Sequence, residues 1–315
     1  MKNTLGPNTS RISKQGWIMI SLLFMLTVIS NVDKAIIGFA SVEIIKDLNL
    51  SPKDWGLVGS VFFWFYSISA ILMGSLSDRI GTKSVIAFIA VVWAGVQFFT
   101  LAVYSLPLLL LTRFILGAGE GPSYSLAMTS ASKWLPKEKL GFGLTLVSIG
   151  GPLGVAASAP ILMFLISAYG WKTGFFAMGM VGVIWLGLWL KLAKEKPGEV
   201  KPFIAKKKLS TPRESKEIDG IESNFSKALF SKNFIIIAFC GFATYWSYTF
   251  GLTWLPNYLA KVRHISDAQL GFAVTLPWIL ITISQLAFSM FSDRLYKKTS
   301  DITRSRVFIL GPVLM

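Results

Sequence analysis

Four charged residues lie inside long apolar segments, where a charge is expensive and usually functional. Asp33 and Lys34 follow an apolar run that begins near Gly16, and Arg113 and Glu120 share another such segment. Asp33 should lie about 9 Å from the helix end at Phe39. Two readings stay open: the charges face a polar cavity, or Asp33 and Lys34 reach the surface from a helix end.

Arg113 and Glu120 are seven residues apart. In a helix they would share one face about 10 Å apart. Arg113 and Asp33 should lie at similar depth, so a charge pair between them is expected. Desolvation disfavours an ionised carboxyl group and a nearby cation favours it. A carboxyl group at the position of Glu120 can therefore load and release a proton as a cavity opens to either side, a static structural ion pair being the alternative.

Polar aromatic side chains occur in the same apolar segments: Tyr66, Tyr124, Tyr245 and Tyr248. In a cavity they would donate hydrogen bonds to a small solute. Tyr residues are also common at membrane interfaces, which is the alternative for each one taken singly. Cys240 and His264 are the single cysteine and the single histidine. We therefore expect no cofactor and no metal site, and consider an enzyme the least favoured class.

The elements that position these residues are expected to be membrane-spanning helices. Hydrophobic residues make up 53% of the chain and charged residues 15%, and a membrane helix needs about 20 apolar residues. The expected helices are approximately Gly16–Phe39, Trp55–Leu76, Val85–Val103, Leu106–Ser132, Gly141–Ala168, Thr173–Leu190, Asn233–Leu259 and Leu270–Phe291, with a ninth beginning at Val307. The sequence thus predicts an all-α integral membrane protein.

Loop charges predict the orientation of these helices. Of 31 Lys and Arg residues, the expected outer loops contain only Lys46, Lys53, Lys172, Lys261 and Arg263, and most others lie in inner loops. By the positive-inside rule, the N-terminus is cytoplasmic in a multi-pass protein of the cell membrane. Topology also explains the net charge of +15, so nucleic-acid binding is not expected.

Two six-helix units are predicted from an internal repeat. Shifted by 215 residues, Ser51–Arg79 overlies Ser266–Arg294 with seven identities, and both copies end in Ser-Asp-Arg. We expect an N-terminal bundle over residues 1–192, a cytoplasmic linker over 193–230 and a partial second bundle over 231–315. Repeats of this kind are typical of transporters. A complete second unit would extend to about residue 430, so we expect helices 10 to 12 to be missing.

The loop after the second expected helix contains Gly74, Asp78, Arg79, Gly81 and Lys83. This G-x-x-x-D-R-x-G-x-K spacing resembles the signature of the major facilitator superfamily. The resemblance implies a latch that gates alternating access, whereas the plainer interpretation is a helix cap with ordinary loop charge. Near Glu120 and in residues 150–154, clustered glycines and prolines favour close helix packing over a moving hinge.

Further motifs resemble the anion:cation symporter family within that superfamily. They are Asn31-Val-Asp33-Lys34, Thr112-Arg113 with Glu120-Gly121-Pro122, and Thr253-Trp-Leu-Pro-Asn-Tyr-Leu259. The resemblance implies that Asp33 and Glu120 bind the coupled proton and that Arg113 couples protonation to substrate binding. It also implies that Lys34 meets a substrate carboxylate and that Asn31 and Tyr66 bind substrate. The sequence departs from the family pattern at three positions: Asn31, Lys34, where arginine is commoner in the family, and Gly151.

The resemblance predicts a proton-coupled symporter of a small organic anion, a carboxylate or sugar acid, functioning as a monomer. An exporter or uniporter of another solute is one alternative. A membrane sensor or scaffold that transports nothing is another.

Overall fold

The computed structural model describes residues 12–136, 139–195, 230–265 and 267–299, and these form helices joined by short loops. The expected linker lies mostly outside the described residues, as does the expected ninth helix. The described helices are α1 (Lys14–Phe39), α2 (Ser41–Asp47), α3 (Pro52–Ile80), α4 (Thr82–Thr100), α5 (Leu106–Glu120), α6 (Ser123–Trp134), α7 (Leu140–Ser148), α8 (Gly150–Tyr169), α9 (Trp171–Leu192), α11 (Lys232–Thr253), α12 (Leu255–Lys261) and α13 (Asp267–Thr299).

Seven helical segments in the described part of the chain are long and apolar enough to cross a membrane. They correspond to seven of the eight helices expected in this part of the sequence. The eighth, Leu106–Ser132, was wrong as one continuous helix. It is divided into α5 and α6 at Gly121-Pro122, where a glycine and a residue without an N–H weaken the helical ladder.

Two further differences concern helix continuity. The expected helix Gly141–Ala168 is divided at Ile149 into α7 and α8, and the expected helix Asn233–Leu259 is divided at Trp254 into α11 and α12. The short helix α2 was not predicted, because seven residues are too few for a periodic pattern to be clear.

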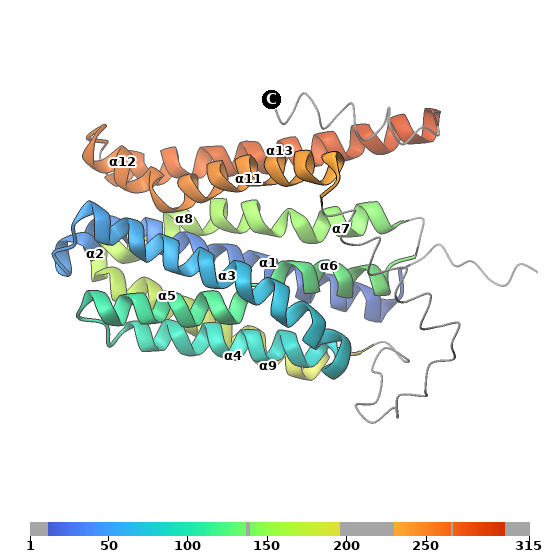
Figure 1. Ribbon diagram of the computed structural model, residues 1–315, viewed down its shortest axis with the longest axis horizontal. Helices are drawn as coiled ribbons and strands as arrows, with labels where there is room; N and C mark the ends of the chain where they lie inside the picture. Colours follow the sequence, from blue (N-terminus) through green and yellow to red (C-terminus); the bar gives the residue numbers. More distant parts are fainter. Residues whose placement is uncertain (1–11, 137–138, 196–229, 266, 300–315) are drawn as a thin grey trace, which may run out of the picture.

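The helices run nearly parallel to one axis and form a layered bundle (Figure 1). Helix α1 packs against α6, α8 and α9, while α3 packs on α5 and α4 on α9. Helices α11 and α13 lie side by side along one flank, where α13 contacts α8 and α11 contacts α1. The C-terminal helices α11 and α13 therefore pack on α1 and α8, which belong to the N-terminal part of the sequence.

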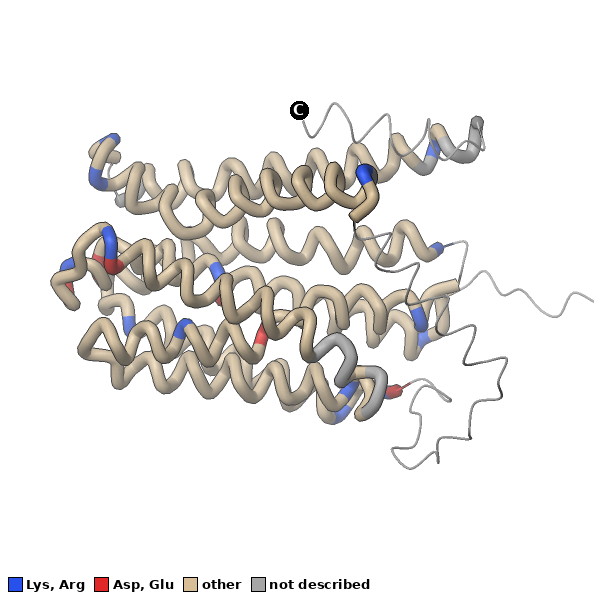
Figure 2. The backbone as a smooth tube through the Cα atoms, viewed as in Figure 1, with Lys and Arg blue, Asp and Glu red and all other residues tan. Residues whose placement is uncertain are grey.

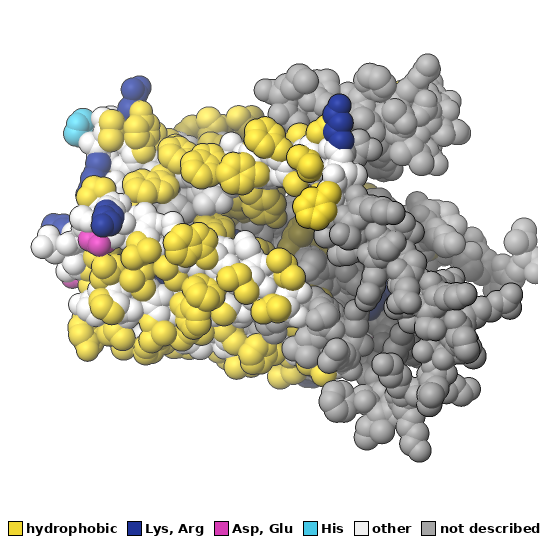
Figure 3. Space-filling view, viewed as in Figure 1, with side chains coloured by type: hydrophobic (Ala, Val, Ile, Leu, Met, Phe, Trp, Pro, Cys, Tyr) yellow, Lys and Arg dark blue, Asp and Glu magenta, His cyan; other side chains and the backbone are white. Residues whose placement is uncertain are grey.

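Apolar side chains cover much of the outer face wherever Figure 3 shows the described residues. Phe239, Phe242 and Trp246 on α11 are all more than 60% exposed. The charged residues instead gather near the two ends of the bundle, apart from a few within it (Figure 2). An apolar belt between polar ends is the surface that a bilayer requires, and the chain is a multi-pass membrane protein.

Glycines allow neighbouring helices to approach closely, which is the interpretation that the sequence favoured over a moving hinge. A Cβ on Gly121 would overlap the Tyr66 carbonyl oxygen and the Ser69 hydroxyl of α3, and one on Gly117 would overlap the Phe62 carbonyl oxygen. Gly150 and Gly154 similarly lie against α1. The spacing Gly117–Gly121 thus brings the α3 and α5 backbones together, which places Glu120 next to the centre of the bundle.

Candidate functional site

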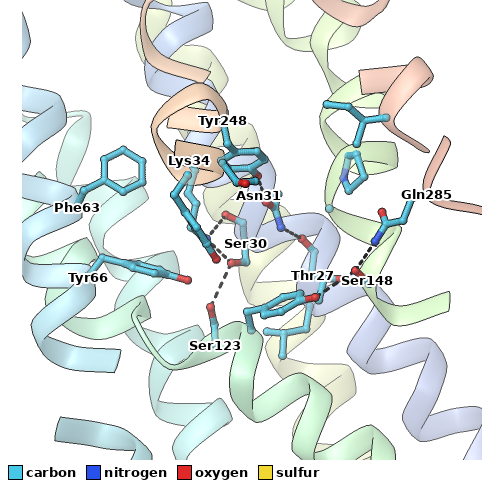
Figure 4. Close-up of a pocket in the computed structure, with 17 residues that line it drawn as sticks. Thr27, Ser30, Asn31, Lys34, Phe63, Tyr66, Ser123, Ser148, Tyr248 and Gln285 are labelled. Atoms are coloured by element: carbon cyan, nitrogen blue, oxygen red, sulfur yellow. Dashed lines mark hydrogen bonds between the residues drawn. The ribbon is translucent and has the colours of Figure 1, made fainter. Parts of the chain in front are cut away.

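A cavity of about 330 Å³ lies between α1, α3, α6, α7, α8, α11 and α13 (Figure 4). All six residues that the sequence predicted to bind substrate line it: Asn31, Lys34, Tyr66, Tyr124, Tyr245 and Tyr248. They come from four helices and from both expected bundles. Two of them, Asn31 and Tyr248, are hydrogen-bonded although they are 217 positions apart in the chain.

Lys34 carries the charge at one end of this cavity. Its ammonium group donates to Glu120 Oε1 at 2.9 Å, to Ser30 Oγ at 2.7 Å and to the Ser30 carbonyl oxygen at 3.0 Å. The Lys34 and Glu120 side chains are 7% and 1% exposed, so the ion pair is almost completely removed from solvent. An ammonium group has three donors, and all three are occupied by protein acceptors.

Other groups around Lys34 favour the pair. The Ser30 hydroxyl donates to the same Glu120 oxygen, and Lys34 Nζ lies 5.1 Å from the centre of the Tyr66 ring. Glu120 Oε2 has no hydrogen-bond partner. A carboxyl group with one paired and one unpaired buried oxygen has a free position at which a proton could bind.

Asp33 points to a different neighbour from Lys34, although the two are adjacent in the sequence. Gln97 on α4 donates from Nε2 to Asp33 Oδ1 at 2.8 Å, and Asp33 is completely buried. Consecutive residues of a helix are about 100° apart around its axis. Lys34 therefore faces the cavity while Asp33 faces α4.

The expected charge pair between Asp33 and Arg113 was wrong as a direct contact. Among the described residues the buried ion pair is the one between Lys34 and Glu120. Arg113 is 2% exposed, and its Nε and Nη2 atoms have no hydrogen-bond partner. The guanidinium carbon lies 5.9 Å from the centre of the Phe175 ring. Asp33 and Arg113 are thus two buried charges, each with unsatisfied polar atoms.

Asn31 connects α1 to α11 beside the cavity. Its Nδ2 atom donates to the Thr27 carbonyl oxygen at 2.8 Å, and its Oδ1 atom accepts from the Tyr248 hydroxyl. A Cβ on Gly151 of α8 would lie 2.9 Å from Asn31 Nδ2. The Asn31 amide therefore occupies the space that a larger residue at position 151 would fill.

Sequence reasoning predicted Tyr124 but missed its two polar partners at the other end of the cavity, Ser148 and Gln285. Gln285 Nε2 donates to Ser148 Oγ at 2.7 Å, and Tyr124 Oη lies 3.1 Å from the same oxygen. Ser148 and Gln285 lie on α7 and α13, opposite Lys34 in the close-up view (Figure 4). A signal existed, since Gln285 interrupts the apolar run Leu270–Phe291 and Ser148 precedes Gly150-Gly151-Pro152.

The predicted signature loop contains a turn between α3 and α4. Gly81 has φ +88°, a conformation that L side chains rarely adopt. Glu195, which follows α9, accepts from the backbone N–H groups of Thr82 and Lys83 at 2.7 and 3.0 Å. Lys83 Nζ donates to the Leu190 carbonyl oxygen at 3.3 Å. The side chains of Gly74, Asp78 and Arg79 lie outside what the structure describes, so their contacts stay predictions.

In the described residues, no group of three His, Cys, Asp or Glu side chains is placed to hold a metal ion. The chemistry available at the cavity is that of a cation, a buried carboxyl group and many hydroxyl and amide groups. These groups can bind an anion and exchange a proton.

Comparison with known proteins gives one family. The model of the Major Facilitator Superfamily matches residues 23–315. The hexuronate transporter of Bacillus subtilis is 34% identical over 289 residues, which cover 91% of this chain and 67% of that protein. A sodium-dependent phosphate transport protein of Arabidopsis thaliana is 28% identical, with 94% and 59% covered. A probable galactarate/D-glucarate transporter of Escherichia coli K12 is 26% identical, with 95% and 72% covered.

The chain therefore spans about three fifths to three quarters of the length of these relatives. Among solved structures, a bacterial homologue of the lysosomal transporter Spinster, in an inward-facing and unoccupied conformation, has a TM-score of 0.65 at 19% identity. The match covers 91% of this chain and 63% of that one. A D-xylose–proton symporter has a TM-score of 0.64 at 15% identity, covering 95% and 81%. At these identities the likeness shows the fold.

Proposed function

This chain belongs to the major facilitator superfamily, and from that premise we propose that it carries a small organic anion together with a proton across the cell membrane. The superfamily membership confirms the all-helical fold expected from the sequence, and the named activities of the relatives are transport rather than enzymatic. Hexuronate, galactarate and glucarate, named in two of the relatives, are organic anions, which supports the substrate class.

The observation that carries the proposal is the buried Lys34–Glu120 ion pair at the edge of the cavity. Because all three Lys34 donors are occupied, an incoming carboxylate has to replace one of the acceptors. Protonation of Glu120 would remove its negative charge and release Lys34 for the substrate. Loss of that proton would favour the internal ion pair again and expel the anion. Proton and anion would then bind together.

The remaining predicted site residues receive roles in the same cycle. We assign substrate contacts to Asn31, Tyr66, Tyr124, Tyr245 and Tyr248, since all of them line the cavity with Lys34. Asp33 is a second candidate carboxyl group, because one of its oxygens is buried without a partner. Arg113 would act on both carboxyl groups through its charge, without a direct contact to Asp33.

The proposed orientation places the N-terminus in the cytoplasm. The end of the bundle that holds α2 has four described lysines, Lys46, Lys53, Lys172 and Lys261, and Arg263. The described part of the opposite end has more, as the positive-inside rule requires: Lys14, Lys83, Lys133, Lys139, Lys191, Lys194, Lys232 and Arg294. In this proposed orientation the cytoplasmic latch is formed by Gly74, Asp78, Arg79, Gly81 and Lys83.

Proteoliposome uptake of labelled organic acids, driven by a proton gradient in full-length protein, tests the proposal. We expect uptake that a protonophore abolishes. Glu120→Gln should lose the dependence on the proton gradient while still exchanging substrate between the two sides. Glu43→Gln, on α2 outside this cavity, is the matched control and should behave like the unmodified protein.

Four outcomes would contradict the proposal. Full proton-driven uptake by Glu120→Gln would remove the coupling role of Glu120. Uptake driven by a sodium gradient alone would make the protein a sodium symporter. Uptake down the concentration gradient of the acid itself, without any ion gradient, would make it a uniporter. Absence of anion uptake by folded protein would favour an exporter or a sensor.

A further inference from the structure

We propose that Tyr124, Ser148 and Gln285 form a second subsite that binds hydroxyl groups of the substrate, so that the protein prefers a hydroxylated organic anion to an unsubstituted one. This inference rests on the proposed function, because it concerns the far end of the same cavity. We call these three residues the neutral subsite. None of them contacts the Lys34–Glu120 pair through a hydrogen bond that the structure shows.

The neutral subsite is assembled from three helices that meet at one serine. Tyr124 comes from α6, Ser148 is the last residue of α7, and Gln285 comes from α13. The Ser148 hydroxyl lies 2.7 Å from Gln285 Nε2 and 3.1 Å from Tyr124 Oη. All three residues line the cavity, and Tyr124 is 43% exposed. Their polar atoms are therefore within reach of a bound solute.

The local backbone adds an acceptor at this point. In a continuous helix the N–H of residue 152 would donate to the carbonyl oxygen of Ser148. Residue 152 is proline and has no N–H. The helix is interrupted at Ile149, directly after Ser148. The Ser148 carbonyl group is thus deprived of its regular helical donor beside the cavity, where Pro152 and Gly151 are lining residues.

The chemistry of the subsite favours a hydroxyl group over a second carboxylate. Gln285 offers a second amide hydrogen and a carbonyl oxygen, and Ser148 and Tyr124 each offer a hydroxyl that both donates and accepts. A sugar hydroxyl also donates and accepts, so it can satisfy both kinds of atom. An ionised carboxylate only accepts, and the subsite holds no charged side chain to compensate it.

The two ends of the cavity therefore recognise different parts of one molecule. Lys34 and Tyr66 lie on one side of the close-up and Ser148 and Gln285 on the other, with Asn31, Tyr248 and Thr27 between them (Figure 4). A carboxylate at Lys34 and hydroxyl groups at the neutral subsite describe a small polyhydroxylated monoacid. The volume of about 330 Å³ is at the lower end of the range for ligand pockets.

The test compares two six-membered-ring acids that differ in their ring oxygen and hydroxyl groups. Dissociation constants of D-glucuronate and cyclohexanecarboxylate are measured calorimetrically with purified full-length protein, at one pH at which both acids are ionised. The unmodified protein should bind D-glucuronate more tightly. Gln285→Leu should raise its dissociation constant about tenfold, since a lost hydrogen bond costs roughly 1.5 kcal/mol.

The same variant should change the dissociation constant of cyclohexanecarboxylate by less than about twofold. Gln269→Leu makes the same substitution on α13 outside the cavity lining and is the matched control. Should Gln285→Leu fold poorly, Ser148→Ala provides the second variant with the same expected selectivity.

The outcomes separate the two proposals. Equal weakening of both acids by Gln285→Leu and Ser148→Ala, or no effect on either, would overturn the neutral subsite while leaving anion binding intact. Failure of the folded, unmodified protein to bind any acid of a wider carboxylate panel would overturn the proposed substrate class itself.

Discussion

At the scale of single residues, the site depends on the directions in which two adjacent charged side chains of α1 point. Asp33 and Lys34 are neighbours in the sequence, yet one bonds to Gln97 and the other to Glu120. The residue types and their depth were predictable from the sequence, because charges inside apolar segments are rare. Their partners were not predictable, because the rotation of α1 about its axis is fixed by packing against α6, α8 and α9.

The Lys34–Glu120 pair gives a prediction about stability that is separate from transport. Lys34→Met leaves the Glu120 charge buried without its cation, and breaking a buried pair in this way costs about 3–5 kcal/mol of unfolding free energy. The double variant Lys34→Met/Glu120→Gln removes both charges, so it should recover most of the stability. Thermal unfolding in detergent at neutral pH measures all three proteins.

Transport should not follow stability in this series. The double variant should remain inactive for anion uptake, because the cation for the substrate carboxylate is absent. Equal unfolding temperatures for Lys34→Met and the unmodified protein would show that the two side chains do not form an ion pair in the membrane protein.

At the scale of helices, the sequence predicted where apolar segments lie but not where they break. The breaks at Gly121-Pro122 and at Ile149 fall next to Glu120 and Ser148, which are the residues that line or flank the cavity. Glycine and proline signal a weak point in a helix. Whether the helix bends, packs closely or ends there depends on neighbours that are distant in the sequence. The close-packing interpretation holds for Gly117, Gly121, Gly150 and Gly154.

The contact between α3 and α5 can be tested with one methyl group. Gly121→Ala should destabilise the protein by about 1–3 kcal/mol, because the added Cβ would overlap Ser69 and the Tyr66 carbonyl oxygen. Gly95→Ala is the matched control, since a Cβ there has nothing within 4 Å. It should be neutral or stabilising by up to about 1 kcal/mol. Both are measured by thermal unfolding in the same detergent, and similar stabilities would mean that α3 and α5 are not in close contact.

The internal sequence repeat also concerns the arrangement of helices. A shift of 215 residues relates Tyr66 on α3 to Ile281 on α13, and both line the cavity. The repeat stays a prediction, and the shared place of these two positions at the cavity agrees with it. The two positions differ in chemistry, because a tyrosine can donate a hydrogen bond to a solute and an isoleucine cannot.

At the scale of the whole molecule, helices from the two expected bundles meet closely at the end that holds α2. A Cβ on Gly38 of α1 would overlap the Leu252 carbonyl oxygen of α11, and one on Gly59 of α3 would lie 3.3 Å from Thr253 Cγ2. Gly56 similarly faces the Trp254 ring, and α2 contacts α12. If the cavity opens alternately to the two sides, these glycine contacts have to separate in one half of the cycle.

A reversible cross-link at this end therefore tests alternating access. In Gly59→Cys/Thr253→Cys, the new Cβ at position 59 would lie 3.3 Å from the place that the Thr253 Cγ2 atom now occupies. This is close to the reach of a disulfide, whose Cβ atoms are about 3.5–4.5 Å apart. The pair is made with Cys240→Ser, because Cys240 is the single native cysteine. Oxidation should join the two cysteines and stop uptake, and reduction should restore it. Each single cysteine variant, treated identically, should continue to transport. Complete cross-linking with an unchanged uptake rate would contradict this mechanism, because transport would then proceed without separation of α3 from α11.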